Sequence, residues 1–168
     1  MPPQPEMAFT TNHGGRRPGT RGTVLHSTRS GRTTPQAKEE EYELTVRYFQ
    51  TPGVQASAHR VIGILPGQNA AMVNDYDMAW HAAEDNEFYL GIEFCQPLPS
   101  DEYSDWQLEE GALTVAFWAK QFGFAINTDT CPRHSDTTQG KRSGKSDPGA
   151  PFPYVDFLNR CREIRDSI

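Results

Sequence analysis

The chain is 168 residues long and carries a formal net charge of −6, with 16 Lys and Arg residues against 22 Asp and Glu residues. Its length predicts one domain with a substantial core, and its acidic balance argues against nucleic acid as a partner. No apolar run is long enough for a membrane span, so we expect no membrane insertion. The opening stretch 1–6 lacks the pattern of a signal peptide, and three cysteines cannot form a closed disulfide set, which indicates reduced thiols.

Residues 1–21 are rich in Pro, Gly, Thr and Arg and show no apolar period. Such a segment buries too little apolar surface to offset its ordering entropy, unless it lies along the body of a domain. We therefore expect an N-terminal tail or extended segment over 1–21 and one folded domain over 22–168. A second polar stretch, 135–147, predicts a long loop.

The first half of the folded domain alternates strand and helix patterns. Residues 23–26 predict a short strand, and a helix should start at Pro35, after Thr34, and run to about Phe49. Residues 58–65 are apolar and β-branched enough for another strand. The apolar positions that share one face of the helix are Tyr42, Val46 and Phe49.

The second half contains the clearest strand pattern of the chain. Residues 88–95 alternate, so that Phe88, Leu90, Ile92 and Phe94 should point to one side of a sheet. A helix over about 101–122 has a wide apolar face, which predicts burial against that sheet. Its expected buried residues are Leu113, Val115 and Phe117. With a last helix over about 154–164, the whole is a mixed α/β pattern.

Chemically active side chains are concentrated near the C-terminal end. His134, Lys145 and Asp147 lie there, and His26 ends a predicted strand far upstream. Two histidines and one carboxylate form a common ligand set for catalytic zinc. Asp147 precedes Pro148, which favours extended geometry, so Lys145 and Asp147 should face the same side. The alternative is a solvated polar turn.

Three further residues could serve either chemistry or structure. Glu93 lies inside an apolar strand, where a carboxylate is costly unless it is paired or functional, although it could also face solvent. His59 and His81 are candidates for catalysis, and each could equally be a hydrogen-bonded core histidine.

Six short motifs, taken in order, resemble the type 2 N-acetylmuramoyl-L-alanine amidases. That family includes phage endolysins, wall-recycling amidases and the peptidoglycan recognition proteins. The resemblance covers roughly residues 22–165. The motifs are Val24–Thr28, Ala56–Ile62, Ala79–Ala82, Gly91–Glu93, Arg133–Asp136 and Gly144–Gly149.

The resemblance implies a fold and a set of roles. The fold would be a single α/β domain over 22–168, in which a central mixed β-sheet is flanked by helices and carries a zinc-containing groove. Matched by motif, the Zn2+ ligands would be His26, His134 and Asp147. The general base would be Glu93 and the oxyanion-stabilising residue Lys145. Trp80 and His81 would lie in the substrate groove.

The chain departs from the family pattern in three places. Some members carry a catalytic tyrosine where this chain has Ala58, which would make Glu93 more necessary. The loop between His134 and Asp147 is longer than in compact members. Cys131 is a rival metal ligand, although only Asp147 has the matching Lys-Ser-Asp-Pro-Gly context.

The resemblance also implies an activity and a setting. The expected reaction is metal-assisted hydrolysis of the amide between the lactyl group of N-acetylmuramic acid and the L-alanine of bacterial peptidoglycan. We expect a monomeric phage-type endolysin, made in the cytoplasm and released to the cell wall through a hole made by another protein. The alternatives are a cytoplasmic amidase that recycles soluble muropeptides, a non-catalytic peptidoglycan-binding module, and a zinc hydrolase of another amide.

Overall fold

The computed structural model describes residues 2–168, and a five-stranded mixed sheet forms its centre, in the order β1-β5-β4-β7-β3. Strands β3, β7 and β4 run parallel, β5 runs antiparallel to β4, and β1 pairs in parallel with β5. The strands are β1 Glu6–Met7, β3 Gly22–Ser27, β4 Arg60–Ile62, β5 Asn69–Ala71 and β7 Tyr89–Phe94. The predicted α/β single domain with a mixed central sheet is confirmed.

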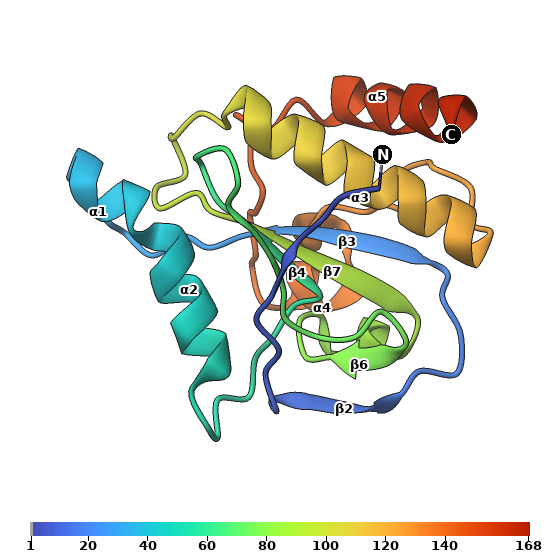
Figure 1. Cartoon of the computed structure of the whole chain (residues 1–168), viewed down its shortest axis with the longest axis horizontal. Coiled ribbons are helices and arrows are strands. Elements are labelled where there is room, and N and C mark those ends of the chain that lie inside the picture. Colours follow the sequence, from blue (N-terminus) through green and yellow to red (C-terminus); the bar gives the residue numbers. More distant parts are fainter. Residues whose placement is uncertain (1) are drawn as a thin grey trace.

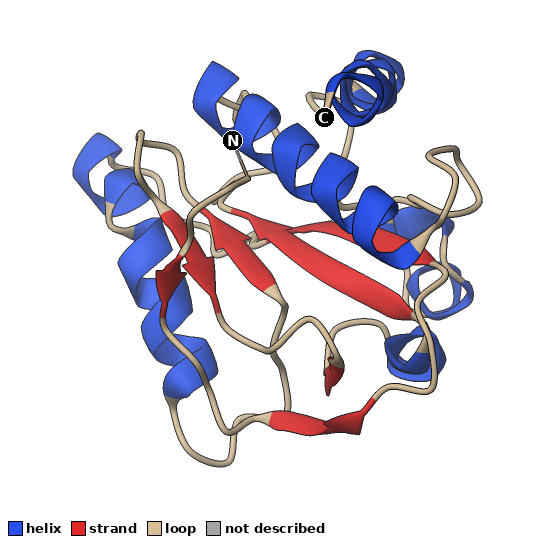
Figure 2. Ribbon diagram, turned by 45° about the vertical axis from the view of Figure 1, so that its right-hand side comes forward, coloured by secondary structure: helices blue, strands red, loops and turns tan. Residues whose placement is uncertain are grey.

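Helices cover both faces of this sheet (Figures 1 and 2). Helix α3 (Asp105–Phe122) packs on one face and carries α5 (Tyr154–Ser167) on its outer side, while α2 (Glu41–Gln50), preceded by α1 (Pro35–Glu39), covers the other. Among residues 2–168, no helix combines the length and apolar character that crossing a bilayer requires. Three short helices complete the set, namely η1 Ala83–Glu87, η2 His134–Asp136 and α4 Thr138–Arg142.

The alternation predicted for β7 separates two cores. Leu90, Ile92 and Phe94 are fully buried in the core shared with α3 and α5. Cys95 belongs to the second core, which lies under α2. The residues of β7 that point away from α3 therefore lie on the face of the sheet that α2 covers. A polar groove, described below, lies on that face.

Helix α3 begins later than predicted, and its buried face is rotated. Ser104 caps it through Gln107, so the helix starts at Asp105 rather than near 101. Val115 is buried and Leu113 packs partly against the core, whereas Phe117 lies outside that cluster. Trp118, only 2% exposed, takes the buried position instead. Because each residue turns the helix by about 100°, Val115 and Trp118 share a face that Phe117 flanks.

Two other predicted elements are shorter than expected. The helix predicted from Pro35 divides at Glu40, where α1 ends and α2 begins, although Thr34 caps Ala37 as its sequence indicates. The strand predicted over 58–65 is ordered as β4 over Arg60–Ile62. It ends there because Gly63 begins a turn in which the Gln68 side chain accepts a hydrogen bond from the backbone N–H of Leu65 at 3.0 Å.

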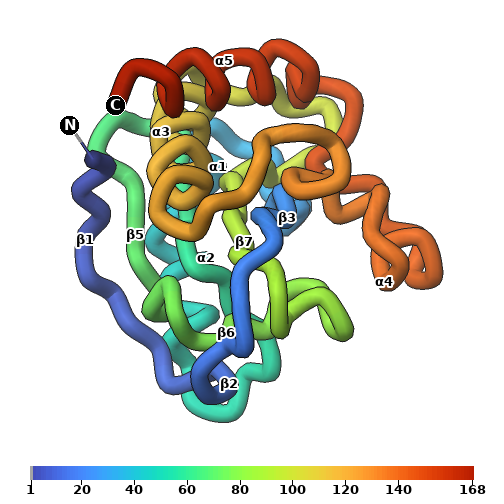
Figure 3. The backbone as a smooth tube through the Cα atoms, turned by 90° about the vertical axis from the view of Figure 1, so that its right-hand side faces the viewer, coloured from blue at the N-terminus to red at the C-terminus, as the bar shows by residue number. Residues whose placement is uncertain are grey.

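The N-terminal segment lies along the body of the domain (Figure 3). After β1, strand β2 (His13–Arg16) pairs antiparallel with β6 (Asp77–Ala79). In the stretch between β1 and β2, the side-chain amide of Asn12 donates to the carbonyl oxygens of Phe49 at 2.7 Å and of Thr51 at 2.8 Å. These carbonyls lie at the C-terminal end of α2, where backbone acceptors lack intrahelical partners. The N-terminal segment thus holds the C-terminal end of α2, and residues of α2 line the groove.

Candidate metal and catalytic site

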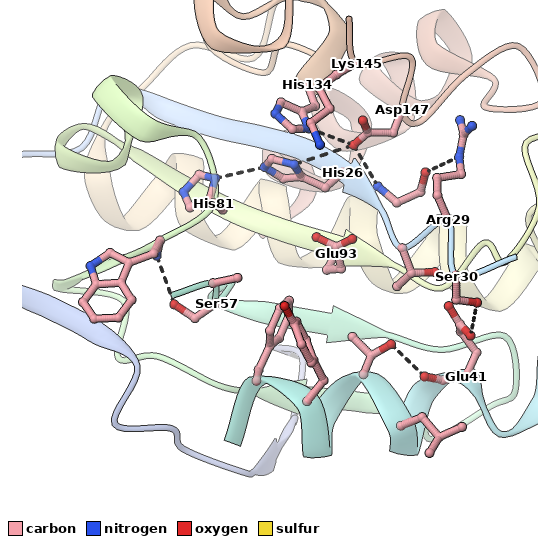
Figure 4. Close-up of a pocket in the computed structure, with 18 of the residues that line it drawn as sticks. His26, Arg29, Ser30, Glu41, Ser57, His81, Glu93, His134, Lys145 and Asp147 are labelled. Carbon is pink, nitrogen blue, oxygen red and sulfur yellow. Dashed lines mark hydrogen bonds and ion pairs between the residues drawn. The ribbon is translucent and has the colours of Figure 1, made fainter. Parts of the chain in front are cut away.

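Two adjacent strands supply the first two polar groups of the site. His26 in β3 stands in register with Glu93 in β7. Their neighbours Leu25 and Ile92 point into the α3 core, so His26 and Glu93 point to the opposite face. Figure 4 shows both side chains on that side of the sheet.

The C-terminal loop brings two more groups to His26. A parallel bridge between Leu25 and Arg133 sets the start of this loop beside β3. The backbone N–H of Ser135 donates to the carbonyl oxygen of Asp147 at 3.1 Å, which closes the long excursion between His134 and Asp147. His26, His134 and Asp147 are all buried, and their candidate ligand atoms lie within 4.8 Å of one another.

The donor atoms of this cluster fit a metal cation. Asp147 Oδ2 lies 3.0 Å from His134 Nδ1 and 3.7 Å from His26 Nδ1. His134 Nε2 lies 2.6 Å from the Gln139 side-chain oxygen, so this nitrogen must carry the ring proton. In a neutral ring, Nδ1 is then an acceptor that faces an acceptor carboxylate. A cation between them resolves that repulsion, and two imidazoles with one carboxylate match a catalytic zinc set.

Burial also favours the neutral form of His26 that metal binding needs. Desolvation, reinforced by His81 and His134, holds the pKa of His26 well below its ordinary value. Desolvation likewise lowers the pKa of His81 to about 4. Neutral imidazole is the form that ligates a metal, so the enclosure of the cluster suits this chemistry.

Glu93 is a carboxyl group held in an unfavourable place for its charge. Burial raises its pKa well above the ordinary value, and the nearby charge of Asp147 raises it further, while Lys145 partly opposes the shift. A carboxyl group whose pKa is moved toward neutrality can exchange protons at working pH. Its side chain lines the same groove as the three candidate ligands.

Lys145 lies on the exposed rim of that groove. Its backbone N–H donates to the carbonyl oxygen of Gly140 at 2.8 Å. Its charge contributes to the lowered pKa of His26 and partly opposes the raised pKa of Glu93. Lys145 and Asp147 both line this groove, and so does Ser146, which the extended Lys-Ser-Asp pattern predicts on the opposite side.

The groove has a volume of about 620 Å³ and runs between two chemically different ends. At one end, the Ser57 hydroxyl accepts from the backbone N–H of Trp80 at 3.0 Å. The exposed Tyr48 also lines the groove. At the other end, the Arg32 Nε lies 3.2 Å from the buried carboxylate of Glu41. Figure 4 shows Ser57 and Glu41 on opposite sides of Glu93.

The remaining sequence candidates separate clearly in the structure. Trp80 and His81 both line the groove, and His81 Nδ1 lies 2.9 Å from His26 Nε2. His59 is a buried structural histidine, which accepts from the N–H of Gly91 at 2.9 Å and lies 3.0 Å from the carbonyl of Asp77. Cys131 lies in the apolar core, away from the ligand cluster.

Sequence reasoning missed the residues that hold the ligand loop. The Gln139 contact to His134 depends on α4 starting just after the ligand, which spacing alone does not reveal. On the other side, Arg29 donates through Nε to the Gln96 side-chain oxygen at 2.9 Å. The hydroxyl of Tyr103 lies 2.8 Å from both that oxygen and the carbonyl of Pro148. No local sequence motif predicts this network, because its members lie far apart in sequence.

Comparison with known proteins gives consistent results. A family model described as N-acetylmuramoyl-L-alanine amidase matches residues 15–150. N-acetylmuramoyl-L-alanine amidase A from Achromobacter lyticus is 38% identical over 71 residues, and the match spans 40% of this chain and 40% of that protein.

Solved structures share the fold. A selenomethionine derivative of AmpD superposes with a TM-score of 0.73 at 17% identity, covering 93% of both chains. A mutant endolysin from Bacillus subtilis superposes with a TM-score of 0.64 at 15% identity, covering 96% of this chain and 98% of that one. At these identities the likeness concerns architecture.

Proposed function

The chain belongs to the N-acetylmuramoyl-L-alanine amidase family, and from that membership we propose that it hydrolyses the amide between the lactyl group of N-acetylmuramic acid and the L-alanine of peptidoglycan. The observation that carries this proposal is the buried cluster of His26, His134 and Asp147. Glu93 and Lys145 line the same groove, so the candidate ligands, a carboxyl group and an ammonium group can all reach one bound amide.

The metal in this proposal is Zn2+, held by His26 Nδ1, His134 Nδ1 and Asp147 Oδ2. When bound, zinc supplies a Lewis acid that polarises the scissile carbonyl and makes water a better nucleophile. Two imidazoles and one carboxylate are a ligand set that suits a divalent cation.

Glu93 is the proposed general base. Its carboxylate takes a proton from the attacking water as the new carbon–oxygen bond forms. The same carboxyl group then returns that proton to the amine nitrogen of L-alanine as the carbon–nitrogen bond breaks. A raised pKa helps the second half of this exchange, because burial makes the protonated carboxyl group easier to form.

Lys145 is the proposed stabiliser of the negative charge that develops on the carbonyl oxygen. Its ammonium stands on the groove rim, and its field already reaches Glu93 and His26. A fixed cation near a developing oxyanion lowers the barrier more than it strengthens ground-state binding. Trp80 and His81 line the groove beside the reacting groups and complete the proposed substrate-contacting set.

The substrate proposed for this groove is peptidoglycan of the intact wall, as for a phage-type endolysin acting after release from the cytoplasm. The groove is bordered by the exposed Lys145 and by Tyr48, which is 55% exposed, so a polymer can lie across it. His26, Glu93, His134, Lys145 and Asp147 all line this one groove. Their presence together favours an enzyme over a non-catalytic binding module.

Mass spectrometry of digested, purified peptidoglycan tests the proposed bond. We expect stem peptides with a free L-alanine amino group and glycan strands that keep the lactyl carboxylate. Chelation should abolish the products and zinc should restore them. Products cleaved within the glycan or within the stem peptide would contradict the assignment.

A parallel assay distinguishes the two enzymatic settings. Intact sacculi and soluble muropeptides are supplied at equal amide concentration, and the initial rates are compared. The endolysin proposal expects turnover of sacculi. Turnover restricted to soluble muropeptides would instead identify a recycling amidase.

A further inference from the structure

His81 stands directly behind a candidate metal ligand. Its Nδ1 lies 2.9 Å from His26 Nε2, and its Nε2 lies 3.0 Å from the carbonyl oxygen of Tyr89. In Figure 4 dashed lines lead from His81 to His26 and from His26 to Asp147, while His134 is linked to Asp147 separately. The position suits a residue that acts through His26 as well as one that touches substrate.

The Tyr89 carbonyl fixes the proton positions along this chain. A carbonyl oxygen can only accept, so His81 Nε2 must carry a hydrogen. In a neutral ring, His81 Nδ1 is then an acceptor, and the hydrogen between the two rings belongs to His26 Nε2. His26 Nδ1, the nitrogen that faces Asp147, is consequently left with its lone pair available.

The surrounding structure holds the His81 ring in this orientation. A Cβ atom at position 91 would come within 2.7 Å of the ring, so Gly91 provides the space in which His81 lies. The backbone N–H groups of His81 and Ala82 both donate to the Asn86 side-chain oxygen, at 2.9 and 2.6 Å. His59 fixes the other side of Gly91 by accepting from its N–H.

We propose that His81 is a positioning residue, which accepts the Nε2–H of His26 and so presents His26 Nδ1 to the metal. This inference rests on the metal site proposed above. Such partners behind a ligand fix its tautomer and orientation, and their loss typically weakens metal binding about 10–100-fold.

Two amide variants separate hydrogen bonding from packing. In His81→Asn the side-chain oxygen replaces Nδ1, so it can still accept from His26. In His81→Gln the longer amide reaches toward the Tyr89 carbonyl, and the acceptor at the Nδ1 position is lost. His81→Leu removes both groups, and His13→Asn is the matched control outside the site.

The measured quantity is the zinc dissociation constant, obtained by competition with a chromophoric chelator. We expect a rise of about 10–100-fold for His81→Gln and His81→Leu, a much smaller rise for His81→Asn, and no change for His13→Asn. Folded His81→Gln and His81→Leu proteins that bind zinc as tightly as the wild type would overturn the proposal. An equal loss in all three His81 variants would also overturn it, because packing alone would then explain the effect.

A second measurement needs no substitution at all. Long-range proton–nitrogen NMR of the metal-free wild type reports which ring nitrogen of His26 carries the proton. We expect the proton on Nε2, and a proton on Nδ1 would refute the proposal even if every His81 variant failed to fold. Neither measurement depends on hydrolysis, so failure of the amidase assay leaves both results interpretable.

Discussion

His26 and Glu93 occupy facing positions on adjacent parallel strands, one a candidate metal ligand and the other a candidate base. Strand pairing fixes their separation more firmly than a loop could. The other two ligands come from the segment after α3, which must fold back onto β3 to complete the site. The site therefore combines a rigid half from the sheet with a half that depends on loop contacts.

The ligand assignment predicts the metal content of two variants. His26→Ala and His134→Ala should each lose bound zinc and activity together, because two remaining ligands cannot hold the ion. Elemental analysis of the purified proteins, beside the wild type and His13→Ala, gives the stoichiometry. Full zinc occupancy in either variant would show that the ligand set is wrong.

Glu93 and Lys145 should affect turnover without affecting metal content. We expect kcat to fall about 10²–10⁴-fold in Glu93→Gln and about 10²–10³-fold in Lys145→Ala. Substrate binding should change much less, because both groups act mainly in the transition state. The measurement is kcat and KM on a soluble muropeptide, with zinc content determined in parallel. Near-normal turnover by Glu93→Gln would move the base assignment to another groove residue, His81 first.

The sequence predicts the candidate metal ligands better than it predicts the residues that hold them in place. The resemblance of the ordered motifs to an amidase family predicts that His26, His134 and Asp147 lie together, and the structure brings them together. Gln139 and Gln96 could not be found, since their partners are set by tertiary folding. The same limit explains the error at Phe117, because the wide apolar face of this helix does not reveal which of its residues meet the sheet.

Helix α3 supplies a direct test of that correction. Trp118 is buried and its indole N–H donates to Asp75 Oδ2 at 2.9 Å, whereas Phe117 lies on the flank of the helix. Trp118→Ala should cost about 3–5 kcal/mol of the free energy of unfolding, and Phe117→Ala clearly less. Denaturant unfolding of both variants measures the difference. A larger loss of stability for Phe117→Ala than for Trp118→Ala would support the sequence prediction that Phe117 lies on the buried face of the helix.

The N-terminal segment should stabilise the groove through Asn12. Asn12→Ala leaves the carbonyl oxygens of Phe49 and Thr51 without this donor, and burial makes such a loss cost about 1–3 kcal/mol. The loss should appear in denaturant unfolding and as faster amide exchange at the end of α2. Gln4→Ala, near the start of the same segment, is the control. Unchanged exchange in α2 would mean that the segment does not hold this helix.

Glu93 should also make stability depend on pH in the metal-free protein. Its folded pKa is raised above the ordinary value of 4.5, so folding favours the protonated form. As the pH rises past 4.5, Glu93 loses its proton in the unfolded chain but keeps it in the folded state. The free energy of unfolding therefore falls with rising pH until the pH passes the higher pKa of Glu93 in the folded state. Glu93→Gln lacks this penalty.

The variant should therefore match the wild type near pH 4 and become progressively more stable than it toward pH 8. Denaturant unfolding of the chelated proteins at both pH values measures this divergence, with Glu43→Gln on the exposed side of α2 as the control. A constant difference between wild type and Glu93→Gln across this range would show that Glu93 keeps an ordinary pKa. Divergence together with a large loss of kcat in the same variant would mean that the groove keeps a destabilising carboxyl group because its reaction needs one.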